Sequence, residues 1–498
     1  EKRGVAVMVP EWQKETCIQC NQCSLVCPHA AIRPVLVNAE EKSAAPEGFE
    51  TLKAVGKDFD GLEFRMQVSP LDCLGCGVCA NVCPAKNKAI TMTEAYNIMD
   101  REAKNYDYVS SLPHVKSDVF KDNTVKGSQF NKPYFEFSGA CAGCGETPYI
   151  KVISQMFGDR MVVANATGCS SIYGGSAPAC PYAKDDNGHG IAWANSLFED
   201  NAEFGLGIKT GLDINHDELI KTLNEVKEKT DSKKLKDAIN SYFEAKTVND
   251  QRANGKNIVE IIEKSSKKCC ACNRVLALQD HFAKDSIWII GGDGWAYDIG
   301  YGGLDHVLAS GQNVNILVLD TEVYSNTGGQ SSKSTPLGAV AKFAAYGKRT
   351  NKKDLGIMAT TYKNVYVAKV AMGANMNQFL TAIKEAEAYD GVSLIIAYAP
   401  CINHGIKMSN SQAEEKKAVD TGYWHLWRYN PTLKMEGKNP FVLDSKEPTL
   451  DYESFLLGEN RYKSLIAKDK DLADKLFAEA KEHAKETYEY YKSLADNK

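Results

Sequence analysis

The chain has 498 residues, of which 43% are hydrophobic and 25% are charged, and its formal net charge is −5. This length predicts two or three domains. The small negative charge does not favour a nucleic-acid-binding protein, because such surfaces usually carry a basic excess. The longest apolar runs, such as SIWIIGG and VSLIIAYA, are far shorter than the roughly 20 residues of a membrane span. We therefore expect a soluble, cytoplasmic protein.

Two runs of cysteines with the same spacing dominate the amino-terminal part. CIQCNQCSLVCP begins at Cys17, and CLGCGVCANVCP begins at Cys73. Thiols this closely spaced indicate metal binding in a reducing compartment rather than disulfides. The spacing CxxCxxCxxxCP is that of bacterial ferredoxins, in which the fourth cysteine of each run binds the other [4Fe-4S] cluster. A pair of zinc sites is the alternative, but zinc rarely takes its thiolates from two interlocked sets.

These runs predict two [4Fe-4S] clusters in a ferredoxin-like α+β domain over residues 1–115. The segment from Arg33 to Arg65 is longer than a minimal ferredoxin needs, and we expect an inserted hairpin or loop there. A polar linker is expected over 116–134. The exchange of fourth cysteines assigns one cluster to Cys17, Cys20, Cys23 and Cys83, and the other to Cys73, Cys76, Cys79 and Cys27.

Apolar segments alternate with helical ones over residues 135–430. Four of them, MVVANATG, SIWIIGGDG, VNILVLDTEVY and VSLIIAYAPC, have the composition of buried strands. Strands separated by helices predict a parallel α/β sheet flanked by helices, whose ligands gather at the carboxyl ends of the strands. We expect a helical insertion at about 214–256. A carboxyl-terminal extension over 431–498 should contain a long amphipathic helix that packs on the body of the protein.

A glycine-rich turn follows one of these predicted strands. In IIGGDGWAYDIG, Asp293 lies between two glycines, and the loop TEVYSNTGGQSS begins after the next strand. One right-handed crossover brings both loops to the same sheet edge. Asp293, the Thr321 hydroxyl and a main-chain carbonyl near Val323 offer hard oxygen ligands for Mg²⁺ that carries phosphate. The spacing from GDG to Asn326 resembles the thiamine diphosphate motif; two unrelated tight turns are the alternative.

Four further thiols lie far apart in the sequence, at Cys141, Cys144, Cys169 and Cys401. Cys169 and Cys401 each follow an apolar strand, so both should lie at the sheet edge that carries the Asp293 and Thr321 loops. We therefore expect a third iron–sulfur cluster beside the diphosphate site.

The segments CAGCGE, ATGCSSIYG, GGDGWAYDIG and TEVYSNTGGQ, together with the two cysteine runs, resemble the pyruvate:ferredoxin (flavodoxin) oxidoreductase family. The resemblance extends from Glu1 into the 440s and covers the two-cluster domain and the thiamine-diphosphate-binding domain. It implies that Asn326 is the active-site asparagine and that Asp293, Thr321 and Val323 bind Mg²⁺. It implies that the third cluster is held by Cys141, Cys144, Cys169 and Cys401. It also implies that the cofactor is lined by Glu146, Cys169, Gly292, Asp293, Gly294, Trp295, Thr321, Glu322, Val323, Tyr324, Ser325 and Asn326.

The resemblance implies a reaction and a set of partners. The expected reaction is the coenzyme A-dependent oxidative decarboxylation of pyruvate to acetyl-CoA and CO₂, with electrons passing through three [4Fe-4S] clusters to ferredoxin or flavodoxin. The family's substrate-binding groups and coenzyme A domain belong to an amino-terminal half that this sequence lacks. We expect that half to be fused to this chain or to be a separate subunit, and the complete enzyme to be a homodimer. The alternatives are a subunit for another 2-oxoacid, such as an arylpyruvate, 2-oxoglutarate or oxalate, and a pure electron carrier.

Three further groups of polar residues and cysteines could bind a metal or act on a cluster. KDDNGHG, with Asp185, Asp186 and His189, is expected to be a glycine-rich turn that flanks the cofactor rather than a metal loop. His404 is expected either to tune a cluster by hydrogen bonding or to be an ordinary surface histidine. Structural or free thiols are expected at Cys180, Cys269, Cys270 and Cys272.

Overall fold

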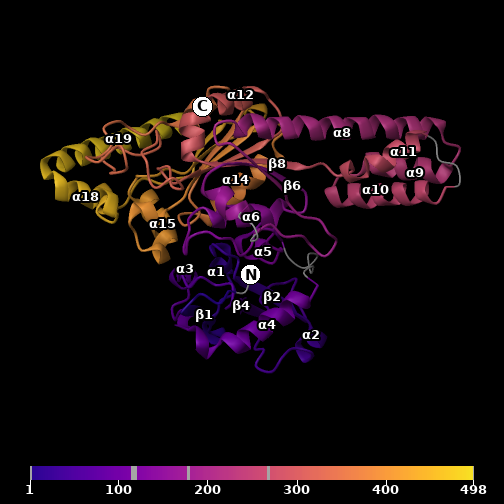
Figure 1. Cartoon of the computed structure of the whole chain (residues 1–498), viewed down its shortest axis with the longest axis horizontal. Helices are drawn as coiled ribbons and strands as arrows, with labels where there is room; N and C mark the ends of the chain where they lie inside the picture. Colours follow the sequence, from indigo (N-terminus) through magenta and orange to yellow (C-terminus); the bar gives the residue numbers. More distant parts are fainter. Residues whose placement is uncertain (1–2, 114–120, 176–179, 266–269, 497–498) are drawn as a thin grey trace.

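The computed structural model describes residues 3–113, 121–175, 180–265 and 270–496. A smaller amino-terminal part packs beneath an α/β body, and two helical segments project from opposite sides of that body (Figure 1). Among the described residues, no helix is both long and apolar enough to cross a membrane. Cys269 and residues 116–120 of the predicted linker fall outside the described ranges; the rest of the linker includes the short helix α5 (Val125–Ser128).

The amino-terminal part is built from two small antiparallel sheets. The first pairs β1 (Met8–Trp12) with β5 (Ile90–Glu94), and the short helices α1 (Gln22–Leu25) and α3 (Val78–Val82) contain the third cysteine of each run. The predicted insertion between Arg33 and Arg65 forms the second sheet, in the order β2-β4-β3. Its elements are β2 (Ile32–Val37), α2 (Ala39–Ser43), β3 (Leu52–Lys53) and β4 (Glu63–Val68). Helix α4 (Met99–Ser111) closes this part.

The body is an eight-stranded sheet in the order β13-β12-β10-β11-β9-β8-β6-β7. The six strands from β7 to β10 are parallel, and the two at the other edge are antiparallel. The four apolar segments predicted as strands lie in it, and the parallel arrangement is confirmed. The strands are β6 (Met161–Ala166), β7 (Ala192–Ser196), β8 (Ser286–Gly292), β9 (Asn315–Asp320), β10 (Tyr366–Val370), β11 (Ser393–Tyr398), β12 (Trp427–Tyr429) and β13 (Phe441–Leu443).

Helices cover both faces of this sheet, which explains why its central strands are almost uniformly apolar. One face packs against α6 (Thr147–Phe157), α7 (Cys169–Gly175) and α14 (Met376–Ala388), and Leu25, Val26 and Val78 of the amino-terminal part join the same core. The other face packs against α12 (Tyr301–Ala309), α13 (Leu355–Thr360) and the carboxyl-terminal helices. The amino-terminal part is therefore continuous with the core of the body.

The helical segment between β7 and β8 is longer than the predicted 214–256. It consists of α8 (Asn201–Lys229), α9 (Lys233–Glu244), α10 (Val248–Glu263) and α11 (Cys270–Ala277). Its outer part has a core of its own, which includes Leu223, Ile239, Val275 and the buried Cys272. The first turns of α8 lie on the sheet, where Gly205 packs against Ile289 so closely that a Cβ atom would clash. Glycines at this contact interrupt the apolar periodicity, which explains why the predicted start at residue 214 lies after the first residue of α8.

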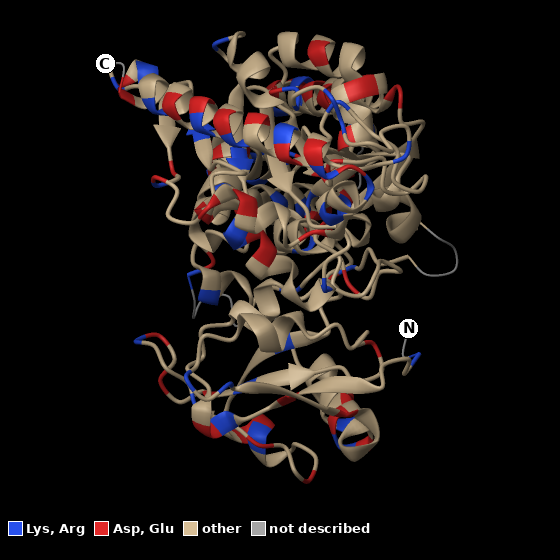
Figure 2. Ribbon diagram, turned by 90° about the vertical axis from the view of Figure 1, so that its left-hand side faces the viewer, with Lys and Arg blue, Asp and Glu red and all other residues tan. Residues whose placement is uncertain are grey.

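The carboxyl-terminal extension wraps onto the face that carries α12. Its long helix α19 buries Leu476, Phe477, Ala480, Tyr488 and Tyr491, so the prediction that this helix packs on the body is confirmed. Acidic and basic residues are interspersed along its outer side (Figure 2). The helices after β11 are α15 (Ser411–Asp420), α16 (Thr432–Met435), α17 (Tyr452–Leu456), α18 (Asn460–Lys468) and α19 (Lys470–Asp496).

Candidate functional site

The carboxyl ends of four parallel strands bring the predicted motifs together. Cys169 follows β6, Asp293 follows β8, Thr321 follows β9 and Cys401 follows β11. The register aligns these ends, since Gly292 pairs with Leu319 and Tyr398 pairs with Asp320. Side chains also connect the loops. The Sγ atom of Cys169 lies 3.2 Å from the hydroxyl of Ser325, and Asn403 Nδ2 donates to the Ser325 carbonyl at 3.5 Å.

A pocket of about 610 Å³, measured to its open mouth, lies at this edge. This is within the usual size range of ligand sites. Ten of the twelve residues predicted to line the cofactor line the pocket; Thr321 and Glu322 do not. Asn326 is exposed at the pocket, whereas Asp293 and Trp295 are buried in its wall. The lining consists of Glu146, Thr167, Gly168, Cys169, Ser170, Phe198, Gly292, Asp293, Gly294, Trp295, Val323, Tyr324, Ser325, Asn326 and Thr327.

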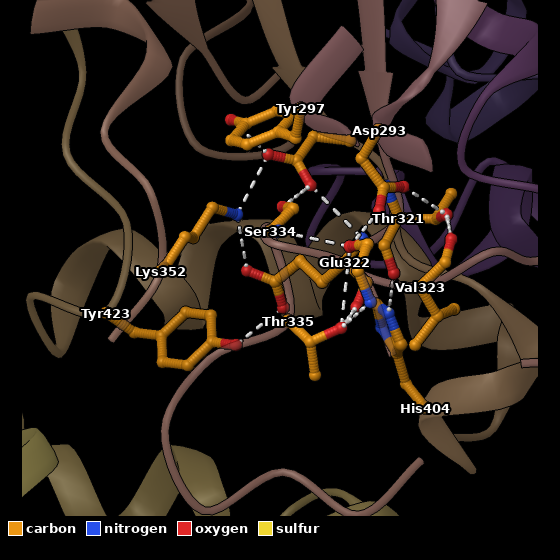
Figure 3. Close-up of polar contacts among 12 residues, drawn as sticks. Asp293, Tyr297, Thr321, Glu322, Val323, Ser334, Thr335, Lys352, His404 and Tyr423 are labelled. Atoms are coloured by element: carbon orange, nitrogen blue, oxygen red, sulfur yellow. Dashed lines mark hydrogen bonds and ion pairs between the residues drawn. The ribbon is translucent and has the colours of Figure 1, made fainter. Parts of the chain in front are cut away.

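Three oxygen atoms converge at the inner end of the pocket. Asp293 Oδ1 accepts hydrogen bonds from the Thr321 hydroxyl at 3.1 Å and from the Thr321 amide at 3.2 Å. The same hydroxyl donates to the Val323 carbonyl at 3.1 Å (Figure 3). Burial, followed by the nearby Asp320 carboxylate, raises the pKa of Asp293 well above its usual range. A hard cation would relieve this uncompensated charge, and the oxygen ligands are those Mg²⁺ prefers, so the residues fit the predicted metal.

The backbone turns sharply at Glu322, which has a positive φ of 61°. The turn places the Thr321 hydroxyl and the Val323 carbonyl beside Asp293 and sends the Glu322 side chain away from the pocket, so this side chain does not line the pocket. The carboxylate instead accepts hydrogen bonds from Lys352 at 2.9 Å, Tyr423 at 2.6 Å and Arg461 at 2.7 Å. Burial alone would raise the pKa of Glu322, but Lys352 and Arg461 lower it to about 2. Glu322 therefore anchors the loop as a buried anion (Figure 3).

His404 joins the loops that follow β9 and β11. It is fully buried, so the reading as a surface histidine is wrong. The Cys401 amide donates to Nδ1 at 3.4 Å, which leaves Nε2 to donate to the Thr321 carbonyl at 2.8 Å. Burial and Arg461 lower the pKa of His404 to about 3, which keeps the imidazole neutral. The ring connects the loop of a predicted cluster ligand to that of a predicted Mg²⁺ ligand.

Glu146 lies in the pocket wall, next to the thiol of Cys144. Its carboxylate is 4% exposed and accepts a hydrogen bond from the Tyr173 hydroxyl at 2.9 Å. Burial raises the pKa of Glu146 to about 7, against the opposing effect of Tyr173. The pocket thus contains a second carboxyl group that can hold a proton near neutral pH.

The four scattered cysteines form one group beside the pocket. Burial is the main cause of the raised pKa of Cys169, followed by the Glu146 carboxylate. The Cys401 and Cys141 thiolates make smaller contributions in the same direction. Burial is also the main cause of the raised pKa of Cys144, to which Cys401 contributes. The structure therefore gathers the predicted third set of thiols, with Cys169 on the pocket side.

The two cysteine runs form two further groups that exchange their fourth members. Burial raises the pKa of Cys23 well above its usual value, and the contributing thiolates are Cys20, Cys17 and Cys83. Burial also raises the pKa of Cys79, and the thiolates that contribute to this shift are those of Cys27, Cys76, Cys23 and Cys73. Cys83 thus lies with the first run and Cys27 with the second, which is the exchange expected of a two-cluster ferredoxin.

The three thiol groups lie in sequence from the pocket toward the surface. The group containing Cys76 adjoins the group beside the pocket, since Gly143 is hydrogen-bonded to Cys76 and Gly77 packs on Ser409. The group containing Cys17 lies farther out: Cys23 adjoins Cys79, and Ile18 is 61% exposed. The three groups of thiols therefore lie in succession from the buried pocket toward the surface of this chain.

Three of the thiols expected to be structural or free lie within the described ranges. Cys272 is buried in the core of the helical segment, and Cys270 and Cys180 are exposed. Asp185 closes a turn by accepting hydrogen bonds from the amides of Asn187 and His189, so the predicted turn is present, but its residues do not line the pocket.

Comparison with known proteins agrees with this arrangement. Residues 16–87 match the 4Fe-4S dicluster domain, and residues 275–397 match the C-terminal TPP-binding domain of thiamine pyrophosphate enzymes. The chain is 59% identical to pyruvate:ferredoxin oxidoreductase of Moorella thermoacetica and 54% identical to pyruvate-flavodoxin oxidoreductase of Klebsiella pneumoniae. These alignments cover 100% and 99% of this chain but only 43% and 42% of the relatives.

A solved 2-oxoglutarate:ferredoxin oxidoreductase from Magnetococcus marinus shows a weaker likeness. It aligns with 53% of this chain and 65% of its own, at 15% sequence identity and a TM-score of 0.32. This similarity is too low to support an argument about function.

Proposed function

The chain is a homologue of the carboxyl-terminal portion of pyruvate:ferredoxin and pyruvate-flavodoxin oxidoreductases, and we propose that it forms the part of such an enzyme that binds thiamine diphosphate and removes electrons. The proposed reaction converts pyruvate and coenzyme A into acetyl-CoA, CO₂, one proton and two electrons. The electrons leave singly through three [4Fe-4S] clusters to ferredoxin or flavodoxin in the cytoplasm.

The observation that carries this proposal is the pocket that joins a magnesium-type oxygen cluster to a group of four thiols. Asp293, Thr321 and the Val323 carbonyl would hold Mg²⁺ and, through it, the diphosphate. Cys169 lies both in the pocket wall and in the adjacent thiol group. When bound, thiamine diphosphate supplies the carbanion chemistry by which a 2-oxoacid loses CO₂. A pure electron carrier has no need of such a pocket, which disfavours that alternative.

The remaining pocket residues have distinct proposed roles. Gly294 lies where a side chain would clash with Tyr324, so the GDG turn lets the backbone of the two loops approach closely. The exposed Asn326 side chain is available to hydrogen-bond charge that develops on the substrate, and we propose it as the catalytic residue. Glu146 can hold a proton on its buried carboxyl, with Tyr173 fixing its orientation.

We propose that the clusters are held by the three thiol groups in the order in which they lie. The cluster nearest the cofactor is assigned to Cys141, Cys144, Cys169 and Cys401. The next is assigned to Cys27, Cys73, Cys76 and Cys79, and the outermost to Cys17, Cys20, Cys23 and Cys83. The carriers must lie in this order because each transfer requires neighbouring centres.

The chain spans about two-fifths of the length of its relatives, and its pocket is open on one side. Several large apolar side chains of the body are exposed; Ile172, Leu197, Ile299 and Phe343 are 52% to 93% exposed. Isolated exposed apolar residues are common, but a pocket that must exclude water needs a cover. We propose that the remaining portion of the enzyme, fused or as a separate subunit, supplies this cover and the groups that bind pyruvate and coenzyme A. The complete enzyme is proposed to be a homodimer.

Two measurements on the anaerobically purified chain test the proposal. Three clusters predict about twelve iron and twelve sulfide per chain. Thiamine diphosphate should raise the melting temperature only when Mg²⁺ is present. Eight iron atoms with no response to the cofactor would favour the electron carrier instead. In the complete enzyme, the rates with pyruvate, 2-oxoglutarate, an arylpyruvate and oxalate decide the substrate; a preference for any of the last three would overturn the assignment to pyruvate.

A further inference from the structure

Lys151 is a buried lysine that the proposed reaction does not use. It lies on α6, the helix that begins beside Glu146 in the pocket wall, and is only 1% exposed. Its side chain reaches from the body into the amino-terminal part, where the ammonium donates to the main-chain carbonyl of Ser24 on α1. It also donates to Gln129 Oε1 at 3.1 Å, and the Ser24 hydroxyl donates to the same oxygen at 3.0 Å. These contacts hold the ammonium at a fixed position.

The ammonium lies beside the first cysteine run, because the Ser24 carbonyl to which it donates directly follows Cys23 and also accepts a hydrogen bond from the Cys27 amide at 3.1 Å. Burial lowers the pKa of Lys151 to about 7, and the Cys27 and Cys23 thiolates act in the opposite direction. Cys23 belongs to the outermost thiol group, and Cys27 belongs to the middle one. The neighbouring Arg33 is already paired with Glu136. Lys151 therefore faces one thiolate of each group.

Within the described ranges, no carboxylate lies within ion-pair distance of Lys151. A buried charge without a counterion is unfavourable, and buried lysines are normally paired. The hydrogen-bond partners of the ammonium are neutral oxygens, which satisfy its donors but do not balance its charge. The anionic groups that act on it are the Cys27 and Cys23 thiolates, and loaded clusters would supply the missing negative charge.

We propose that Lys151 is the counterion of the two ferredoxin-like clusters and that its charge raises their reduction potentials. The inference rests on the proposed function, because it requires both clusters. A cluster that accepts an electron gains one negative charge, and a nearby fixed cation stabilises this reduced state. Net charge around a cluster is one of the factors that set its potential. By raising these two potentials, Lys151 favours electron movement away from the cluster beside the pocket.

The test compares midpoint potentials in variants of the anaerobically purified chain, measured by redox titration followed by electron paramagnetic resonance. Lys151→Met removes the charge at similar length, Lys151→Gln also keeps hydrogen-bond donors, and Lys151→Arg keeps the charge. Lys234→Met, at an exposed position of α9, is the matched control. Both neutral variants should lower the potentials of the two ferredoxin-like clusters. Lys151→Arg and the control should leave them close to the wild-type values.

Iron content separates this inference from the proposed function. If the wild-type chain holds no clusters, the proposed function itself fails. If all variants retain iron but the potentials do not change, Lys151 does not tune the clusters. If both neutral variants lose iron while Lys151→Arg retains it, the residue serves assembly of the interface and the redox proposal is overturned. A lowered potential in Lys151→Met alone, with Lys151→Gln unchanged, would assign the effect to hydrogen bonding and would also overturn it.

Discussion

Replacing Asp293 by Asn should stabilise the chain in the absence of cofactor. The carboxylate is 1% exposed, and burial and Asp320 both oppose its charge. Asn keeps the shape and can still accept the Thr321 hydrogen bonds, while its amide can donate to the Ser332 hydroxyl that now donates to Oδ2 at 2.6 Å. Removing the charge removes the cost of burying it, and an uncompensated buried group costs about 1–3 kcal/mol, so we expect a gain in the free energy of unfolding of this order. Urea unfolding without Mg²⁺ should show a gain of this size.

The same substitution should abolish binding of the cofactor. A ligand at 100 times its Kd stabilises the folded state by about 2.7 kcal/mol, so thiamine diphosphate with Mg²⁺ should raise the melting temperature of the wild-type chain and leave that of Asp293→Asn unchanged. Asp298→Asn, on the following turn but outside the pocket lining, is the control and should respond like the wild type. If Asp293→Asn is less stable than the wild type without cofactor, the buried carboxylate is not destabilising. If the variant still responds to thiamine diphosphate with Mg²⁺, Asp293 is not part of the metal site.

Three further outcomes follow from other contacts. Arg461→Met removes the partner of the buried Glu322 and Glu459 carboxylates and should cost about 3–5 kcal/mol in urea unfolding; a loss below about 1 kcal/mol, or an equal loss in the exposed Lys463→Met, would contradict this. Cys169→Ala should lower iron from about twelve to about eight per chain, whereas twelve would exclude Cys169 as a ligand. Burial and Lys369 lower the pKa of His425 to about 3. The unfolded chain therefore binds protons first as the pH falls below 6.5, and stability present above that pH is lost on acidification, by about 1.4 kcal/mol at pH 5.5. His425→Gln should remove this part of the difference in urea unfolding between pH 8 and pH 5.5; an unchanged difference would show that the imidazole is charged in the folded state.

Residues near one another in the sequence were the most predictable part of the site. The spacing of Cys17, Cys20 and Cys23 requires a tight loop, and a loop of that kind points its thiols to one side. The apolar runs ending at Gly292 and Asp320 predicted buried strands, and the parallel sheet then placed their loops together. The contact between Asp293 and Thr321 could therefore be predicted from the two apolar runs and from the rule that loops following neighbouring parallel strands lie at the same sheet edge.

Other features gave no local signal. Glu322 lies between two predicted Mg²⁺ ligands, and only the positive φ of this residue shows that its side chain points toward Arg461 rather than the pocket. His404 follows a cysteine by three residues, which is equally compatible with a surface position. Lys151 lies on a helix whose residues are almost all buried, but its neighbours along the chain do not show which groups its ammonium would contact.

The amino-acid sequence by itself determined which residues can ligate metal and which segments become strands, because ligand spacing and hydrophobic periodicity act over a few residues. Only the tertiary structure decided where charges without local partners lie. The folding of α1 against α6 brings Lys151 beside Cys23 and Cys27, and the packing of α18 brings Arg461 to Glu322. Electrostatic energy depends on distance in space and on burial, and neither quantity can be obtained from distance along the chain.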